Sequence, residues 1–98
     1  MPFQERWSER AQTDYLRIIG YLLENWSKKE AEVFMEQVEK CIGLLKQHPY
    51  LYRESDQKKG VRRCVITKQV SLYYRVQDDA IQIITLTDNR QNPSQLEL

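Results

Sequence analysis

The sequence predicts an α+β domain in which a helical hairpin packs on one face of a single four-stranded sheet. Between residues 8 and 48 the apolar side chains recur every three or four positions, which is the spacing of amphipathic helices. Between residues 61 and 87 β-branched and aromatic residues dominate, as in strands. The helical and strand patterns follow one another instead of alternating, which favours α+β over βαβ units. A chain of 98 residues has the size of one domain, so we expect a single domain over residues 1–98.

The N-terminal segment predicts a short strand followed by a helix. Residues 3–7 alternate aromatic and polar side chains, which is the period of a strand. Ser8 then stands at an N-cap position, and an apolar stripe follows it. The stripe predicts a helix of about four turns. Its members are Ala11, Tyr15, Ile18, Ile19, Leu22 and Trp26.

A second helix is predicted directly after the first. Ser27 and Glu30 match the Ser-x-x-Glu capping box, and Pro49 ends the helical pattern near residues 47 and 48. Because the connection is short, the two helices form an antiparallel hairpin. The apolar stripe of the second helix consists of Ala31, Phe34, Val38, Cys41, Ile42 and Leu45.

The C-terminal half predicts a loop and then three strands. Residues 50–60 show no sustained period, so we interpret them as a loop. Residues 61–67, 70–76 and 80–87 have strand composition and are separated by short polar connections, which predicts an antiparallel meander. Together with the N-terminal strand, the meander forms one four-stranded sheet. The helices cover one face of this sheet, and the opposite face is free to bind a partner.

The composition excludes several classes of protein. No apolar stretch approaches the ~20 residues of a membrane span, and the first residues lack the pattern of a secretion signal, so we expect a cytoplasmic protein without membrane contact. The two cysteines, Cys41 and Cys64, are too few for a disulfide framework or a metal cluster. We expect both to be reduced packing residues, and we expect neither a metal nor a cofactor.

Positive charge is concentrated in one stretch of the chain. The net charge is only +1, yet residues 53–75 hold seven Lys or Arg against two acids, a local excess of five. Such a run often forms nothing more than a solvated face, but it is also what a site for phosphate or for an acidic partner requires.

The arginines of the predicted meander point to an anionic partner. Two hairpin registers are open, and they place either Arg62 or Arg63 directly opposite Arg75. Like charges across a sheet cost stability, which favours a role in binding. Tyr73 lies on the same predicted face as Arg75 and adds an aromatic surface. The alternative is that the guanidinium groups extend into water or pair with nearby carboxylates such as Glu54 and Asp88.

A polar cluster follows the last predicted strand. It runs from Asp88 to Pro93 and contains Arg90, which would lie at the rim of the same sheet face. Asp-Asn followed by Asn-Pro is equally good turn chemistry. We therefore predict a functional basic patch, with no catalytic residue assigned in it. Its members are Arg62, Arg63, Tyr73, Arg75 and Arg90.

These segments, taken in order, resemble the RelE/ParE superfamily of bacterial toxins. The resemblance extends from about Phe3 to Leu96 and rests on Gly60-Val61-Arg62-Arg63, on the tract from Leu72 to Val76, and on Asn89-Arg90-Gln91-Asn92-Pro93. It implies a curved antiparallel sheet flanked by two helices. It also implies a toxin of a type II toxin-antitoxin, or plasmid stabilisation, system that inhibits growth, and an antitoxin whose C-terminal segment wraps the toxin. A homodimer and a heterotetramer with the antitoxin both stay open.

The resemblance leaves the toxic chemistry between two branches. RelE-like members cut ribosome-bound mRNA with strand cations, an arginine after the last strand and often a C-terminal Tyr or His. Arg62 or Arg63 and Arg90 match the cations, but Ser71 replaces a further arginine and Leu96 lies near the position of the tyrosine. ParE-like members share the Arg-x-x-Pro ending and poison DNA gyrase.

We favour the ParE-like branch, because no His or Tyr follows Tyr74 and general acid-base cleavage needs a group that exchanges protons near neutral pH. The sole histidine, His48, is expected to be a helix-terminal residue. Whether the chain is an enzyme is not decided by the sequence. A third reading is a degenerate member that binds its antitoxin without being toxic.

Overall fold

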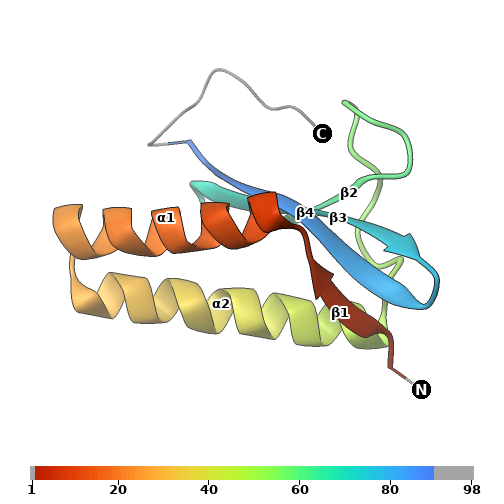
Figure 1. The fold of residues 1–98 in the computed structure, drawn as a ribbon, viewed down its shortest axis with the longest axis horizontal. Helices are drawn as coiled ribbons and strands as arrows, with labels where there is room; N and C mark the ends of the chain where they lie inside the picture. Colours follow the sequence, from red (N-terminus) through yellow and green to blue (C-terminus); the bar gives the residue numbers. More distant parts are fainter. Residues whose placement is uncertain (1, 90–98) are drawn as a thin grey trace.

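A computed structural model of the chain describes residues 2–89. Two antiparallel helices lie side by side along one face of a twisted sheet, and the loop before β2 projects beyond the edge of the sheet (Figure 1). The predicted helical hairpin, meander and single sheet are confirmed. The elements in chain order are β1 (Gln4–Trp7), α1 (Glu9–Asn25), α2 (Lys28–Gln47), β2 (Arg62–Val65), β3 (Val70–Gln77) and β4 (Ala80–Asp88).

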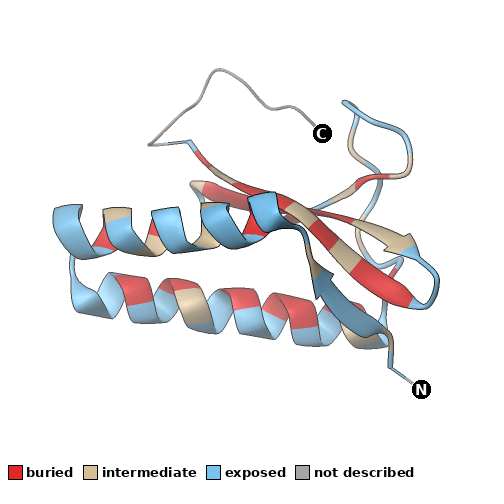
Figure 2. Cartoon of the chain, viewed as in Figure 1, coloured by how far each residue is buried: buried red, intermediate tan, exposed pale blue. Residues whose placement is uncertain are grey.

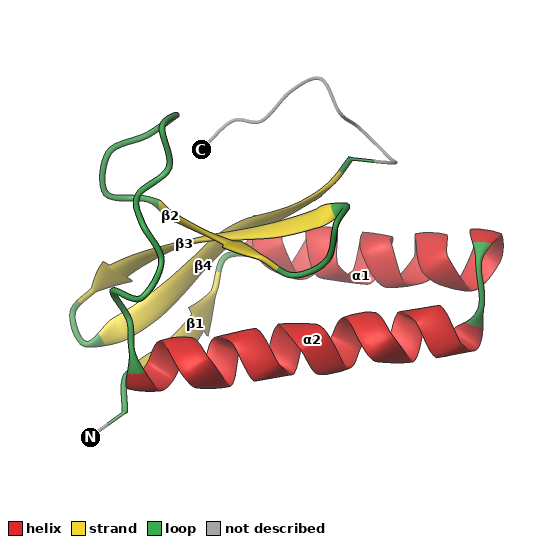
Figure 3. Ribbon diagram, turned by 180° about the vertical axis from the view of Figure 1, so that it is seen from behind, coloured by secondary structure: helices red, strands yellow, loops and turns green. Residues whose placement is uncertain are grey.

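The sheet is mixed, which corrects the purely antiparallel sheet that the resemblance implied. Its order is β1-β4-β3-β2, and β1 runs parallel to β4 while the other neighbours are antiparallel (Figure 3). The β3–β4 hairpin turns at Asp78 and Asp79, whose φ angles of 53° and 58° are those of a type I′ turn. This tight turn fixes the direction of β4, and β1 adds to its free edge.

The predicted helix starts are confirmed by their side-chain caps. The Ser8 hydroxyl oxygen accepts a hydrogen bond from the backbone N–H of Ala11 at 2.9 Å, and the Ser27 hydroxyl accepts one from Glu30 at 3.1 Å. Each bond satisfies a backbone donor that the first helical turn leaves free. The Ser8 hydroxyl also donates to the carbonyl oxygen of Ile84 at 2.7 Å, so the same residue ties the start of α1 to β4.

The hydrophobic core lies between the helices and the sheet, where the buried residues of both layers face each other (Figure 2). Tyr74 on β3 is fully buried, and its phenol donates a hydrogen bond to the carbonyl oxygen of Pro49 at 2.9 Å. Burial raises the pKa of Tyr74 to about 12, because the phenolate would lose its hydration. Other large buried side chains are Phe34, Ile18, Leu45, Leu72, Ile81 and Ile83.

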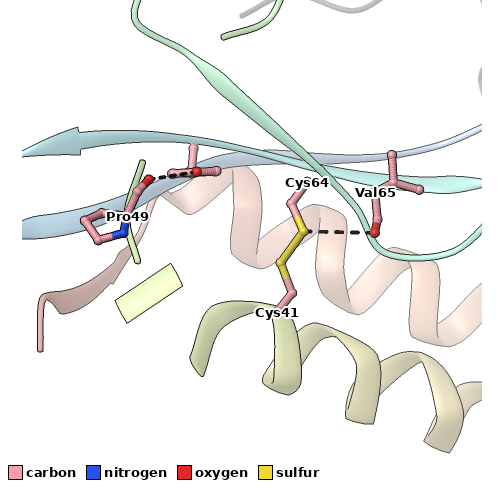
Figure 4. The surroundings of a disulfide bond; sticks show 5 residues. Cys41, Pro49, Cys64 and Val65 are labelled. Carbon is pink, nitrogen blue, oxygen red and sulfur yellow. Dashed lines mark hydrogen bonds between the residues drawn. A yellow bond between two sulfur atoms is a disulfide. The ribbon is translucent and has the colours of Figure 1, made fainter. Parts of the chain in front are cut away.

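The two cysteines meet across this core. Cys41 on α2 and Cys64 on β2 are both buried, and the structure joins their sulfur atoms in a disulfide (Figure 4). This corrects the expectation of two reduced cysteines. The sequence could not reveal the pair, because the docking of α2 on the sheet, and not the spacing of the two residues, brings them together.

Residues 2–89 contain neither a candidate membrane span nor a candidate metal site. No helix in this part of the chain is long and apolar enough to cross a membrane. Within the same residues, no three His, Cys, Asp or Glu side chains are grouped so that they could hold a metal ion.

Candidate functional site on the open sheet face

The register of the β2–β3 hairpin differs from both predicted registers. Arg62 pairs with Tyr74 and Arg63 with Tyr73, so neither arginine lies opposite Arg75. The cause is a short connection, in which the Thr67 hydroxyl accepts hydrogen bonds from the backbone N–H groups of Gln69 and Val70 at 3.2 and 3.1 Å. This cap starts β3 close behind the end of β2. The expected pair of facing arginines is therefore wrong.

Arg62 does not belong to the open face. Side chains alternate along a strand, and Arg62 shares the helix-facing side with Cys64, whose partner across the strands is the buried Leu72. Its guanidinium donates to the carbonyl oxygen of Tyr52 at 2.6 Å and lies 5.0 Å from the centre of the Tyr50 ring. These contacts hold the loop after α2 against the sheet. Arg62 is therefore a structural residue in this fold and leaves the predicted patch.

Three of the predicted patch residues do come together on the open face. Arg63 lies directly beside Tyr73, and Arg75 follows two positions along β3, on the same side of the sheet. We call Arg63, Tyr73 and Arg75 the open-face cluster. The Arg63 side chain is exposed and its Nε donates to the Ser71 hydroxyl at 3.0 Å, whereas the Tyr73 side chain is 6% exposed.

The two arginines of the open-face cluster are not neutralised by carboxylates of the described residues. Ion pairs between described residues join Asp14 to Arg17 and Glu5 to Lys46. In this part of the chain no carboxylate lies within 4.0 Å of the guanidinium nitrogens of Arg63 or Arg75. The alternative expectation, in which Glu54 and Asp88 pair with these arginines, is therefore not observed among the described residues.

A cleft of about 370 Å³ lies at the edge of the open-face cluster. The loop before β2 forms one wall and the outer side of β2 and β3 forms the other. From the sequence this loop was expected to be a connection only. The mixture of acids and bases next to Arg63 was the available signal. The lining consists of Arg53, Glu54, Ser55, Asp56, Gln57, Arg63, Val65 and Tyr73.

The other predicted residues lie elsewhere. Arg90 falls outside the described residues. His48 caps the C-terminal end of α2, where its backbone N–H donates to the Leu44 carbonyl oxygen at 2.9 Å, and so belongs to the helix layer as predicted. The open-face cluster therefore contains cations and an aromatic ring but no histidine.

A second concave surface, not expected from the sequence, lies where α1, α2 and β1 meet. This groove has a volume of about 820 Å³ and runs between α1, α2 and β1. Tyr15 and Leu16 line its α1 side, and Glu36 and Glu39 line its α2 side. The signal in the sequence was the row of acidic residues at three- and four-residue spacing along α2.

Comparisons with known proteins agree with this geometry. A model of the family described as the ParE toxin of the type II toxin-antitoxin system parDE matches residues 6–93. The chromosomal ParDE system of P. aeruginosa contains a chain that superposes with a TM-score of 0.74 at 18% identity, over 88% of this chain and 95% of that one. A YoeB/ParE toxin from Agrobacterium tumefaciens gives a TM-score of 0.66 at 15% identity, over 87% and 96%.

A more distant structure has the same fold. The E. coli RelBE toxin-antitoxin complex gives a TM-score of 0.61 at 13% identity, over 88% of this chain and 95% of the other. No curated protein sequence matches the chain. At these identities the solved structures establish the RelE/ParE-like fold, and the family match over most of the chain establishes descent. The chain therefore belongs to the ParE toxin family of type II toxin-antitoxin systems.

Proposed function

We propose that this toxin is neutralised by a cognate antitoxin that covers the open-face cluster, and that its target is DNA gyrase. Both parts are supported by the guanidinium groups of Arg63 and Arg75, which lie on either side of Tyr73 in the open-face cluster. Neither group forms an ion pair with a carboxylate among the described residues. Guanidinium groups in this arrangement bind anionic partners through bidentate hydrogen bonds.

The antitoxin part of the proposal rests on charge complementarity. A segment with acidic and apolar side chains would pair with Arg63 and Arg75 and would cover Tyr73 and Val65, which is 58% exposed. The similar chains from P. aeruginosa and E. coli come from toxin-antitoxin systems, which supports a partner of this kind.

The choice of gyrase over mRNA rests on proton transfer. Cleavage beside a ribose hydroxyl needs a side chain that accepts and returns a proton near neutral pH. Tyr74 is buried on the other side of the sheet with a pKa of about 12, and His48 lies in the helix layer. Arginine stays protonated in proteins and cannot act as the base. A member of the ParE family that acts by binding needs no such group.

A second candidate is a ribosome-dependent mRNA endonuclease of the RelE type. It is favoured by Arg63, because an exposed arginine can fix a phosphate and stabilise the charge that develops on it. A third candidate is a degenerate member that binds the antitoxin only. Gyrase and ribosomes are cytoplasmic, so the proposal places the toxin there.

Expression of the chain without its partner separates the three candidates. Gyrase inhibition predicts filamentous cells and trapped gyrase–DNA cleavage complexes, with translated mRNA intact. Codon-positioned mRNA ends without trapped gyrase would reject the gyrase target in favour of the endonuclease. Normal growth with soluble protein present would favour the degenerate member. Co-expression of the neighbouring small open reading frame is expected to restore growth, and a gene without such a neighbour would contradict the antitoxin proposal.

A matched pair of variants tests the open-face cluster itself. Arg63→Ala/Arg75→Ala is expected to lose antitoxin affinity and toxicity together while the protein stays folded. Arg6→Ala removes an exposed arginine from β1, at the other edge of the sheet, and is expected to keep both. Equal behaviour of the two variants would show that the cluster is not the site.

A further inference from the structure

The outer side of α1 exposes a short apolar row that the single chain does not use. Leu16 is 67% exposed and Leu23 is 52% exposed. Gly20 lies between them, four residues after the first and three before the second, so all three occupy one face of the helix. Scattered exposed leucines are ordinary on protein surfaces. A row that contains a glycine requires a separate explanation.

No packing contact around Gly20 requires a glycine at this position. Glycine in the interior of a helix is destabilising relative to alanine. A Cβ atom added at Gly20 would meet no atom within 4 Å, so no neighbouring element demands its absence. A glycine at this position allows another backbone to approach closely.

Charges of opposite sign flank the row on one edge. Arg17 is 62% exposed at its side chain, and its ion pair is a loose one with Asp14 at 3.6 Å. Glu24 is exposed and lies seven residues further on, which is about 10 Å along the helix axis. Arg17 and Glu24 are therefore on the same edge of α1 but too far apart to pair with each other.

We propose that α1 packs against α1 of a second copy of this chain, antiparallel and across a two-fold axis at Gly20. In that arrangement each Leu16 meets the Leu23 of the other copy. Arg17 of each copy meets Glu24 of the other, because both pairs are centred beside Gly20. A two-fold contact requires this self-complementarity, in which each attractive pair occurs twice.

The flanking charges favour a second copy over an acidic antitoxin segment. Such a segment would be attracted by Arg17 but repelled by Glu24, whereas a second antiparallel α1 satisfies both. The surface lies on the helix layer, on the side of the molecule opposite the open-face cluster, so the contact goes beyond the proposed function and does not depend on it (Figure 1). One helix pair buries an area at the low end of specific interfaces, so the dimer should be reversible at micromolar concentrations.

Sedimentation velocity on the full-length chain, purified without antitoxin, tests the contact over a range of concentrations. We expect a monomer–dimer equilibrium. Arg17→Glu and Glu24→Arg, each made alone, should weaken dimerisation at least about tenfold, because two attractive pairs become repulsive. The double variant Arg17→Glu/Glu24→Arg should restore it. A chain that stays monomeric at all concentrations, or a double variant that fails to recover, would overturn the proposal.

Two glycine variants provide a matched control that does not depend on charge. Gly20→Ala and Gly43→Ala should both raise the melting temperature, since the added Cβ meets nothing within 4 Å at either position. Only Gly20→Ala should weaken the dimer. Equal weakening by Gly43→Ala would assign the contact to the groove between the helices instead. Loss of antitoxin binding in the Arg17 or Glu24 variants would assign the surface to the antitoxin, independently of the gyrase result.

Discussion

Arg62 and Arg63 are neighbours in the sequence, but the first lies on the helix-facing side of β2 and the second on the open face. The Arg62 guanidinium makes its contacts inside the chain: it donates a hydrogen bond to the Tyr52 carbonyl oxygen and lies against the Tyr50 ring. Arg63 is exposed, and its Nε donates to the Ser71 hydroxyl. The strand pleat, and not the residue type, therefore decides which arginine stabilises the fold and which one is available for binding.

Truncation of an apolar side chain on each face should show the largest contrast. Leu72→Ala removes a fully buried side chain and leaves a cavity, so we expect the free energy of unfolding to fall by about 2–5 kcal/mol. Val65→Ala, on the open face, should change it by less than about 0.5 kcal/mol. Urea denaturation followed by circular dichroism measures both values. A large loss for Val65→Ala would mean that the open face carries core packing.

Arg62 and Arg63 should differ in how much each contributes to the free energy of unfolding. Arg62→Ala is expected to lower the free energy of unfolding by about 1.5–3 kcal/mol, because the charged donor to the Tyr52 carbonyl is lost. Arg63→Ala should cost less than about 1 kcal/mol, since its bond to Ser71 lies at the surface. The same urea series decides this, and equal losses would remove the distinction between the two faces.

For antitoxin binding the order of the two residues should be reversed, with Arg63 contributing more than Arg62. Arg63→Ala is expected to weaken the cognate antitoxin about tenfold, equivalent to about 1.4 kcal/mol, while Arg62→Ala leaves the affinity of the folded fraction nearly unchanged. Isothermal titration calorimetry at low and high salt tests this. A salt dependence that is the same in Arg63→Ala as in the original chain would argue against direct contact.

The last expected effect is a dependence of stability on alkaline pH. The pKa of Tyr74 is raised from 10.0 to about 12 by burial, so the unfolded chain ionises first. Its contribution to stability is complete below pH 10 and is lost as the pH rises from 10 towards 12. Urea midpoints across this range should fall, and Tyr74→Phe should remove part of the slope. The rest should persist, because burial also raises the pKa of Tyr15.

Local signals in the sequence determined the elements of this protein. Ser8 and Ser27 marked both helix starts because an N-cap acts on backbone groups two or three residues away. Helical and strand periodicity depends on neighbours within one or two turns, so the helical hairpin and the strand meander could be predicted. The alternation of side chains along strands also placed Tyr73 and Arg75 on one face, but the sequence left open whether Arg62 or Arg63 joins them.

Tertiary structure alone decided the features that join distant segments. The parallel pairing of β1 with β4, the register that turns Arg62 inward, and the meeting of Cys41 with Cys64 all depend on how layers dock. A shift of one residue in a hairpin moves every side chain to the other face, and a single threonine cap at Thr67 set that shift. Composition and periodicity depend on nearby residues only, so they cannot predict contacts between residues that are far apart in the chain.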